Sequence, residues 1–262
     1  MGNITLFLIR HGESVDNVAG LLAGVRDSPL TSHGTIQARR LGAHLASTRL
    51  DWIFASNLQR AVSTAEAVHE AQPEAKPPLV QVPDLREKDF GSDEGRRWDK
   101  AVAAAEDIET KQSMRERSAR FIDEHLSPII LSCADGEDTT NIAIVSHGMI
   151  LASLLAVLRG PECFQPSRVS SLNADVPARW SNTGFTQLDI VVDASAPSTP
   201  PPRWPHCRLT VASINSVAHL AGLKKTRGGI GSAQHDARQR TVTSFFAPGP
   251  SKKRKAEEQL EK

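Results

Sequence analysis

Hydrophobic and polar positions alternate along this chain in segments that predict strands and helices in turn. Short apolar runs typical of buried strands occupy residues 4–9, 52–55, 79–82, 142–146, 184–192 and 208–214. Apolar residues at helical spacing predict helices over 34–47, 58–71, 97–126 and 149–158. Because strands that alternate with helices form parallel sheets with a helix layer on each face, we expect an α/β fold, a three-layer α/β/α sandwich around a mostly parallel sheet.

Two segments depart from this alternation. Residues 194–205 contain five prolines and are typical of a surface loop between the last two strands. From about Thr226 onward, Gly, Ser, Gln and charged residues replace the apolar periodicity, which indicates a disordered tail. We therefore expect one folded domain over 1–223 and a basic tail over 224–262.

The net charge of +1 hides a difference between these two parts. The tail holds ten Lys and Arg against four Asp and Glu, whereas residues 1–223 hold 21 against 26. A mildly acidic domain disfavours direct nucleic-acid binding by the folded part of the chain. The basic tail needs a separate explanation.

Composition narrows the class of protein further. No stretch reaches the roughly 18 apolar residues of a membrane helix, so we expect no membrane association. The three cysteines, Cys133, Cys163 and Cys207, are widely spaced and odd in number, which predicts no disulfide framework. Such cysteine usage favours a reducing, intracellular compartment.

Four polar segments follow predicted strands or lie in loops after them. They are Arg10-His11-Gly12-Glu13, Ser56-Asn57-Leu58-Gln59-Arg60, Leu85-Arg86-Glu87 and Ser146-His147-Gly148. Open α/β sheets place their ligands in the crevice at the carboxyl ends of strands, where both histidines stand. Two imidazoles and two arginines at that edge predict a compact cationic pocket for a phosphoryl group, assisted by N–H groups at helix N-termini.

These residue types suit phosphoryl transfer. One imidazole can attack phosphorus and form a covalent phosphohistidine. Arg10, Arg60 and the other histidine would neutralise the non-bridging oxygens in the transition state. Glu87 is the candidate that protonates the leaving oxygen and then activates water. This chemistry requires no metal and no cofactor.

Other interpretations of the same residues remain at this stage. A single histidine at a strand end is more often a hydrogen-bonded turn residue than a catalyst. The two histidines could bind a metal, but no third ligand stands at useful spacing, so we expect none. Asp89 and Glu94 share the loop of Glu87 and compete for its role. His33, in a Ser-His-Gly turn, fits a helix-capping region better than a catalytic role.

Six motifs follow one another in a set order. They are LIRHGES with Asn17, PLTSHG at 29–34, SNLQRAVSTAE at 56–66, LREKDFGSDEG at 85–95, VSHGM at 145–149 and Asn182-Thr183-Gly184. The ordered set resembles the histidine phosphatase superfamily, with its phosphoglycerate mutase-like fold, over about residues 3–220. The resemblance implies a phosphorylated small-molecule substrate and these site residues: His11 as nucleophile, Arg10, Arg60 and His147 as the phosphate pocket, Glu87 as acid and base, and Asn17 as a pocket residue.

The superfamily that the motifs resemble contains both hydrolases and mutases. The mutases typically have a longer, more basic insertion between the acid/base motif and the second histidine, and here sixty residues separate Glu87 from His147. Residues 14–20 also lack the tryptophan usual in mutases. We therefore expect a phosphomonoester hydrolase. The alternatives are a phosphoglycerate mutase-type phosphotransferase and a catalytically minor protein that mainly binds a partner.

The tail carries a pattern of its own. Residues 239–246 read Gln-Arg-Thr-Val-Thr-Ser-Phe-Phe, which resembles the peptide that docks on the replication sliding clamp, PCNA. The matching residues are Gln239, Val242, Phe245 and Phe246, of which the last three share one face of a short helical turn. Aromatic anchors of this kind dominate binding hot spots. Docking of the same segment on the folded domain and a chance match are the alternatives.

A basic run, Lys252-Lys253-Arg254-Lys255, follows that motif. It is typical of a nuclear import signal, and its alternative is a solvated charged run. The glutamates after it make direct DNA binding weaker. The tail therefore predicts an intracellular protein of the nucleus, the cytoplasm or both.

Overall fold

The protein is built on one seven-stranded sheet, seen in a computed structural model that describes residues 2–100, 107–133, 139–171, 180–192, 202–225 and 230–236. The strands are β1 (Gly2–Arg10), β2 (Trp52–Ala55), β3 (Leu79–Gln81), β4 (Thr139–Ser146), β5 (Val169–Ser171), β6 (Phe185–Val192) and β7 (Cys207–Ser216), in the order β3-β2-β4-β1-β6-β7-β5. Of the strands described, β6 alone runs antiparallel to its neighbours. The expected mostly parallel sheet is confirmed.

Side chains of the central strands point alternately to two separate apolar cores. In β1, Ile4, Leu6 and Leu8 belong to one core, and Phe7 and Ile9 belong to the other. Each such fully buried side chain contributes about 1.5–3 kcal/mol. A slip of one residue in register would move each set into the opposite core, where it would no longer fit the side chains packed there. This alternation explains why helices must cover both faces of the sheet.

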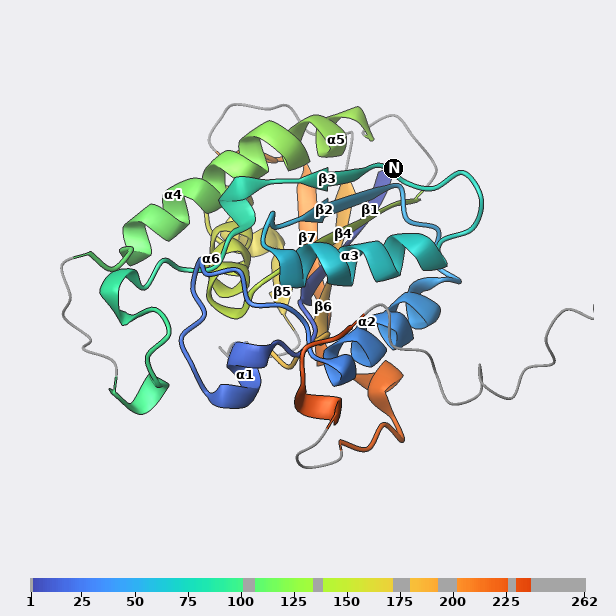
Figure 1. Cartoon of the computed structure of the whole chain (residues 1–262). Helices are drawn as coiled ribbons and strands as arrows, with labels where there is room; N and C mark the ends of the chain where they lie inside the picture. The colour runs from blue at the N-terminus through green and yellow to red at the C-terminus, as the bar shows by residue number, and fades with distance from the viewer. Residues whose placement is uncertain are drawn as a thin grey trace, which may run out of the picture.

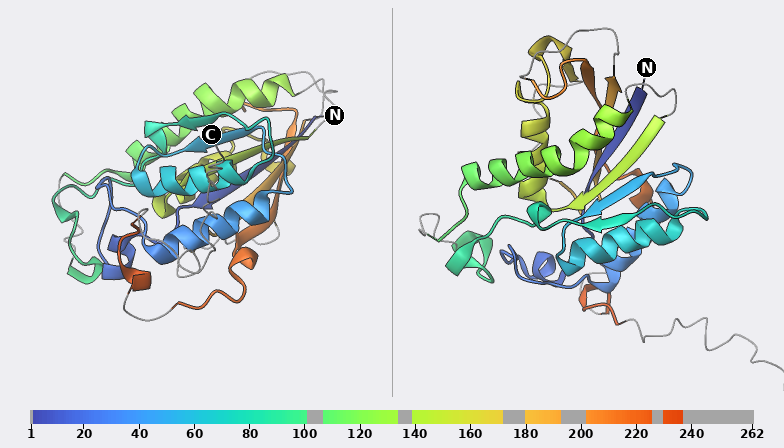
Figure 2. Two further views of the ribbon diagram at one scale, coloured as in Figure 1. Left: turned by 45° about the vertical axis from the view of Figure 1, so that its right-hand side comes forward. Right: turned by 90° about the horizontal axis from the view of Figure 1, so that it is seen from above.

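Helices form the two outer layers of the sandwich (Figures 1 and 2). The core on one face lies under α2 (Ser32–Leu45) and α3 (Gln59–Ala71). The core on the other face lies under α4 (Lys111–Phe121), a π-helical turn (Ile122–Leu126), α5 (Ser127–Ser132) and α6 (Gly148–Leu158). The three-layer α/β/α architecture is therefore confirmed.

The helix expected over 97–126 has different bounds where the structure describes it, and residues 101–106 of this stretch lie outside the described residues. It begins at Lys111, where Thr110 accepts a bond from the Ser113 amide at 3.1 Å, and it continues through the π turn into α5. Upstream, Asp107 accepts bonds from the backbone and hydroxyl of Ser92, an alternative to helix formation that short polar side chains favour. Pro128 lacks the N–H that an unbroken α-helix requires, which accounts for the π turn just before it.

Short elements were not expected from the pattern. They are β5 at the sheet edge, α1 (Val15–Ala19) and the 3₁₀ turns Pro83–Leu85, Gly91–Asp93, Trp98–Lys100, Pro166–Arg168, Ala218–Leu220 and Ile230–Ser232. In α1, Ser14 and Asn17 form a reciprocal capping box, so local hydrogen bonds define this helix without an apolar period. Elements of three to five residues are too short for a periodic signal.

Residues beyond the expected boundary at 223 contact the folded domain. Lys225 forms an ion pair with the buried carboxylate of Glu13, and the backbone of residues 233–235 bonds to residues 30–32 at the start of α2. Composition gave no signal for these contacts, because backbone pairing needs no apolar side chains. The segment 230–236 therefore lies against the folded domain, while the division of the chain at residue 223 stays a prediction.

Three parts of the sequence analysis lie outside the described residues. They are the clamp-like motif with Gln239, Val242, Phe245 and Phe246, the basic run 252–255, and residues 194–201 of the proline-rich loop. Over the ranges that the structure does describe, no helix is both long and apolar enough to cross a membrane.

Candidate active site

The sheet topology brings the predicted site residues to one edge. β1 and β4 are parallel neighbours with Arg10 opposite Ser146, so the residues that follow, His11 and His147, emerge side by side. The His11 amide donates to the Ser146 carbonyl at 2.9 Å, and the two imidazole centroids lie 4.9 Å apart. Arg60 reaches this edge from the first turn of α3, which follows β2. The expected convergence of strand ends is present.

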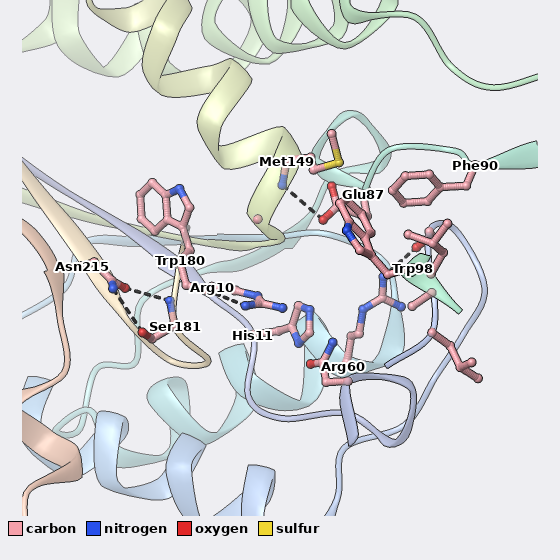
Figure 3. A pocket seen from close by; sticks show the side chains of 16 residues that line it. Arg10, His11, Arg60, Glu87, Phe90, Trp98, Met149, Trp180, Ser181 and Asn215 are labelled. Carbon is pink, nitrogen blue, oxygen red and sulfur yellow. Dashed lines mark hydrogen bonds between the residues drawn. The ribbon is translucent and has the colours of Figure 1, made fainter. Parts of the chain in front are cut away.

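A cavity of about 520 Å³ opens over this edge (Figure 3). Its wall contains Arg10, His11, Asn17, Leu21, Leu22, Ala23, Gly24, Arg60, Glu87, Phe90, Trp98, Gly148, Met149, Trp180, Ser181 and Asn215. Five of the six residues expected in the site line it, and His147 lies fully buried behind His11. The volume is within the range of small-molecule sites.

His11 is held as a neutral imidazole with one nitrogen turned away from the protein backbone. Its Nδ1 lies 2.7 Å from the Gly12 carbonyl oxygen, so Nδ1–H is the donor and Nε2 keeps its lone pair. Burial holds the pKa of His11 well below its usual value, and the nearby positive charges of Arg60 and Arg10 lower it further. An unprotonated Nε2 in a cationic setting is a nucleophile for an electrophilic, anionic centre.

His147 is fixed from the opposite side. Its Nε2 lies 2.8 Å from the Ser56 hydroxyl, and its Nδ1 is buried without a partner among the described residues. Burial holds the pKa of His147 well below its usual value, with Arg60, His11 and Arg10 adding to the effect. A buried ring nitrogen without a protein partner is costly, and an oxyanion beside it can accept its proton in a hydrogen bond.

Two guanidinium groups, the buried one of Arg60 and the partly buried one of Arg10, flank His11 without any carboxylate partner within 4 Å in the described chain. Arg60 donates to the carbonyls of Arg26 at 2.7 Å and Gly24 at 2.6 Å, and Arg10 donates to the Trp180 carbonyl. Burial lowers the pKa of both arginines, while the charge of Glu87 acts against that shift. Buried cations held only by neutral carbonyls favour an anionic ligand between them.

Glu87 reaches the cavity from the loop after Pro83–Leu85 and caps α6. Its carboxylate accepts bonds from the amides of Met149 and Ile150, both at 3.2 Å, in the first turn of that helix. The competing Glu94 instead accepts the Val25 amide at 2.7 Å, and Asp89 accepts the Gly91 amide at 2.8 Å. Neither competitor lines the cavity, so Glu87 is the carboxylate at this site.

Asn17 enters the cavity from α1. Its side-chain oxygen accepts bonds from the Ser14 amide and from the Asn182 side chain at 3.0 Å, so its NH₂ group remains the donor for a ligand. Asn182 also donates to the His11 carbonyl at 3.2 Å and so links the late motif to the first one. His33 lies in the first turn of α2, whose cap is Thr31, and it does not line the cavity.

Sequence reasoning missed the outer wall of the cavity. Phe90, Trp98, Trp180, Ser181 and Asn215 come from four separate loops or strand ends and belong to no polar motif at a strand end. A tryptophan beside a loop carries no signal of its own, because buried aromatic residues are common. Only their shared position around the cavity distinguishes them.

Arg117 of α4 holds the segment that carries Glu87. It is buried, forms an ion pair with Glu109 at 2.7 Å, and donates to the backbone carbonyls of Asp84, Arg86 and Glu87. The Glu109 pKa is lowered, because the bonds and charge of Arg117 outweigh the cost of burying that carboxylate. One side chain therefore orders both ends of this loop.

We expect Arg117→Ala to destabilise the fold by about 3–5 kcal/mol, because it removes the cation beside the partly buried Glu109 carboxylate and leaves three carbonyls without their donor. Urea unfolding measures this change. The matched control is Arg115→Ala on the same helix, whose pair with Glu162 is solvent-exposed and contributes at most about 1 kcal/mol. Equal losses in the two variants would contradict the assignment of Arg117.

The lowered histidine pKa values predict a pH dependence. Between the lowered folded values and the ordinary value of 6.5, the unfolded chain binds more protons than the folded chain at His11 and His147. Stability should therefore fall as the pH drops below about 6.5. The NMR signals of the His11 and His147 rings, followed as a function of pH, measure the two pKa values directly. Unfolding experiments at about pH 7 and pH 5 measure the change in the free energy of unfolding. Titration of His11 at or above 6.5 would contradict this expectation.

Comparison with known proteins places the chain in a family. A profile of the histidine phosphatase superfamily, branch 1, matches residues 6–182, which include every motif from LIRHGES to Asn182. The chain therefore belongs to the histidine phosphatase superfamily. In the described part of the chain, no three His, Cys, Asp or Glu side chains lie close enough together to bind a metal ion.

Individual relatives include both activities found in the superfamily. A protein of Schizosaccharomyces pombe described as a probable phosphatase is 30% identical over 251 residues, which span 92% of this chain and 79% of the relative. A 2,3-bisphosphoglycerate-dependent phosphoglycerate mutase of Methylorubrum populi is 31% identical over 170 residues, 59% of this chain and 79% of the mutase. The solved α-ribazole phosphatase of Shigella flexneri has a TM-score of 0.57 at 26% identity, over 81% of this chain and 96% of that one.

Proposed function

We propose that this protein hydrolyses phosphomonoesters through a covalent phosphohistidine at His11. The observation that carries the proposal is a neutral His11 with a free Nε2, placed between the buried Arg60 and the partly buried Arg10, neither of which has a carboxylate partner among the described residues. The S. pombe relative, described as a probable phosphatase and matched over most of both chains, supports hydrolysis.

In the first step, the Nε2 lone pair of His11 attacks phosphorus and the phosphorus–oxygen ester bond breaks. Glu87 gives its proton to the leaving oxygen, so the alcohol departs neutral. Arg10, Arg60 and the Nδ1–H of His147 stabilise the three non-bridging oxygens, where charge is concentrated in the transition state. The product is a phosphohistidine enzyme with an ionised Glu87.

In the second step, the Glu87 carboxylate takes a proton from a water molecule, whose oxygen attacks phosphorus. The phosphorus–nitrogen bond breaks, inorganic phosphate leaves, and His11 regains its lone pair. Glu87 ends protonated, ready for another cycle. The bonds from the first turn of α6 fix the carboxylate in place for both proton transfers.

The second candidate is a phosphoglycerate mutase-type phosphotransferase, which the similarity to the M. populi mutase favours. The two activities share the first step and differ in the acceptor, water or a second substrate. Incubation with a ³²P-labelled phosphomonoester, followed by rapid quenching, should trap an acid-labile, base-stable phosphoenzyme. Release of free phosphate faster than transfer between phosphoglycerates supports hydrolysis, and the reverse supports the mutase. Absence of both products would refute the proposal.

We also propose that the tail binds the replication sliding clamp. A peptide of residues 236–250 should bind the clamp at micromolar strength, because Val242, Phe245 and Phe246 would fill one apolar pocket. The double variant Phe245→Ala with Phe246→Ala should abolish binding measured by calorimetry. The control is Thr243→Ala, at a free position of the motif, which should bind like the parent peptide. Failure of the parent peptide to bind would contradict the proposal.

The same tail would bring the enzyme to the nucleus. Replacing Lys252, Lys253, Arg254 and Lys255 by alanine in a fluorescent fusion should move the protein from the nucleus to the cytoplasm. An unchanged distribution would show that this basic run is a solvated charged segment only.

A further inference from the structure

The charges of the cavity wall limit the substrate. Among the residues that line the cavity, the charged ones are Arg10, Arg60 and Glu87. Both arginines flank His11 and serve the phosphoryl group in the proposed mechanism. Over the residues that the structure describes, the wall therefore offers no further cation to a second anionic group, and the carboxylate of Glu87 repels one. A leaving group without negative charge suits this cavity.

The apolar part of the wall is strongly aromatic. Trp180 lies on one side of Arg10 and His11 in Figure 3, and Phe90 and Trp98 lie on the other, beside Glu87. Phe90 and Trp180 are buried, whereas Trp98 is 69% exposed, the highest exposure among the large hydrophobic side chains of the described chain. An indole left exposed at the mouth of a catalytic cavity is a candidate contact for the distal part of a substrate.

Hydrogen bonds hold the Trp98 segment beside the loop that follows the first motif. The Trp98 amide donates to the Gly20 carbonyl at 3.2 Å, and Arg97 pairs with Leu21 in an isolated bridge. Leu21 itself lines the cavity. The backbone of Trp98 is thus fixed relative to the wall, while its indole remains free to stack on a planar group.

We propose that the substrate is a small phosphomonoester whose leaving group is uncharged and carries a flat aromatic ring, which stacks on Trp98. The inference rests on the proposed hydrolase function and adds its substrate class. Two sources share this chemistry: an aryl phosphate, with the ring next to the ester oxygen, and a nucleoside 5′-monophosphate, with the ring beyond a sugar. Neutral Asn215 and Ser181 complete the wall and can bond to ring or sugar substituents.

The test measures kcat/KM of the full chain for matched esters. We expect phenyl phosphate or adenosine 5′-monophosphate to exceed glycerol 3-phosphate by about 10-fold or more, as stacking on an aromatic side chain predicts. Phenyl phosphate should also exceed 4-carboxyphenyl phosphate, which adds a second anion to the same ring. Whichever of phenyl phosphate and adenosine 5′-monophosphate has the higher kcat/KM shows whether the natural substrate is an aryl phosphate or a nucleoside 5′-monophosphate. Preference for glycerol 3-phosphate or 3-phosphoglycerate would overturn the inference.

The variant Trp98→Ala should lower kcat/KM for the preferred aromatic ester about 10-fold and lower that for glycerol 3-phosphate by a clearly smaller factor, because only the aromatic ester loses a stacking partner. Because the indole is exposed, the variant should fold, and Leu131→Ala, 62% exposed on α5, is the control for loss of a surface hydrophobe. Equal losses for both esters would overturn the role of Trp98. Turnover of all esters without preference refutes only this inference, whereas no turnover and no phosphoenzyme refutes the proposed function.

Discussion

Replacement of His11 by alanine should lower turnover of any phosphomonoester by about 10⁴-fold or more, because His11 is the only histidine among the described residues that line the cavity and so the only one there that can form a phosphohistidine. Arg10, Arg60 and His147 would still surround phosphorus, but only water would remain as the attacking group. The measurement is phosphate release together with trapping of ³²P on the protein. We expect no acid-labile label in this variant under conditions that label the parent enzyme.

His33→Ala is the matched control for that experiment. His33, like His11, directly precedes a glycine, but it lies in the first turn of α2 and away from the cavity, so its loss should leave turnover and label unchanged. Thermal unfolding of both variants checks that the fold survives. An acid-labile phosphoenzyme in the His11 variant would mean that His147 or another residue is the nucleophile, which would contradict the proposed mechanism.

The inner half of the site follows from the sequence for a topological reason. Parallel neighbouring strands end at the same edge, so the residues after β1 and β4 must meet once the strands are correctly paired. The apolar runs at 4–9 and 142–146 predicted those strands, and the structure pairs Arg10 with Ser146 in register. His11 and His147 are close because of sheet pairing, which an apolar run followed by a polar turn can signal.

The outer half of the site does not follow in this way. Trp98 reaches the cavity from a 3₁₀ turn, Trp180 from a loop and Asn215 from the end of β7, and no common period relates their positions along the chain. The same holds for Arg117, whose helix begins at Lys111 instead of near residue 97. A helical pattern shows that a face is apolar, but the cap at Thr110 and the crossing bonds of Asp107 decide where the helix starts.

The tail illustrates a further limit of sequence patterns. Composition indicated disorder from about residue 226, yet residues 233–235 pair with the backbone at residues 30–32. Lys225 adds an ion pair to Glu13, which also accepts a bond from the Thr31 hydroxyl at 3.0 Å. Backbone pairing and a single long-range ion pair leave no signature in local composition, so only the folded structure reveals them.

Arg60 is the residue for which we expect the second largest loss of activity. Its guanidinium donates hydrogen bonds to two backbone carbonyls of the loop at residues 24–26, and it places a buried positive charge beside His11. Arg60→Ala removes both effects, so we expect kcat/KM to fall by about 10³-fold and the inhibition constant of inorganic phosphate to rise in parallel. Arg60→Lys should recover part of the loss, because it restores the charge without the planar fork.

Comparison of the two Arg60 variants separates charge from loop geometry. If the positive charge of Arg60 accounts for most of the effect, the lysine variant restores the inhibition constant of phosphate towards the parent value. The alanine variant is then still inhibited only weakly by phosphate. If the bonds to Gly24 and Arg26 dominate, both variants lose inhibition alike, because lysine cannot span the two carbonyls. Arg39→Ala, at an exposed position of α2, is the control and should behave like the parent. Unchanged phosphate inhibition in Arg60→Ala would remove Arg60 from the phosphate site, and the anion would then depend on Arg10 and His147.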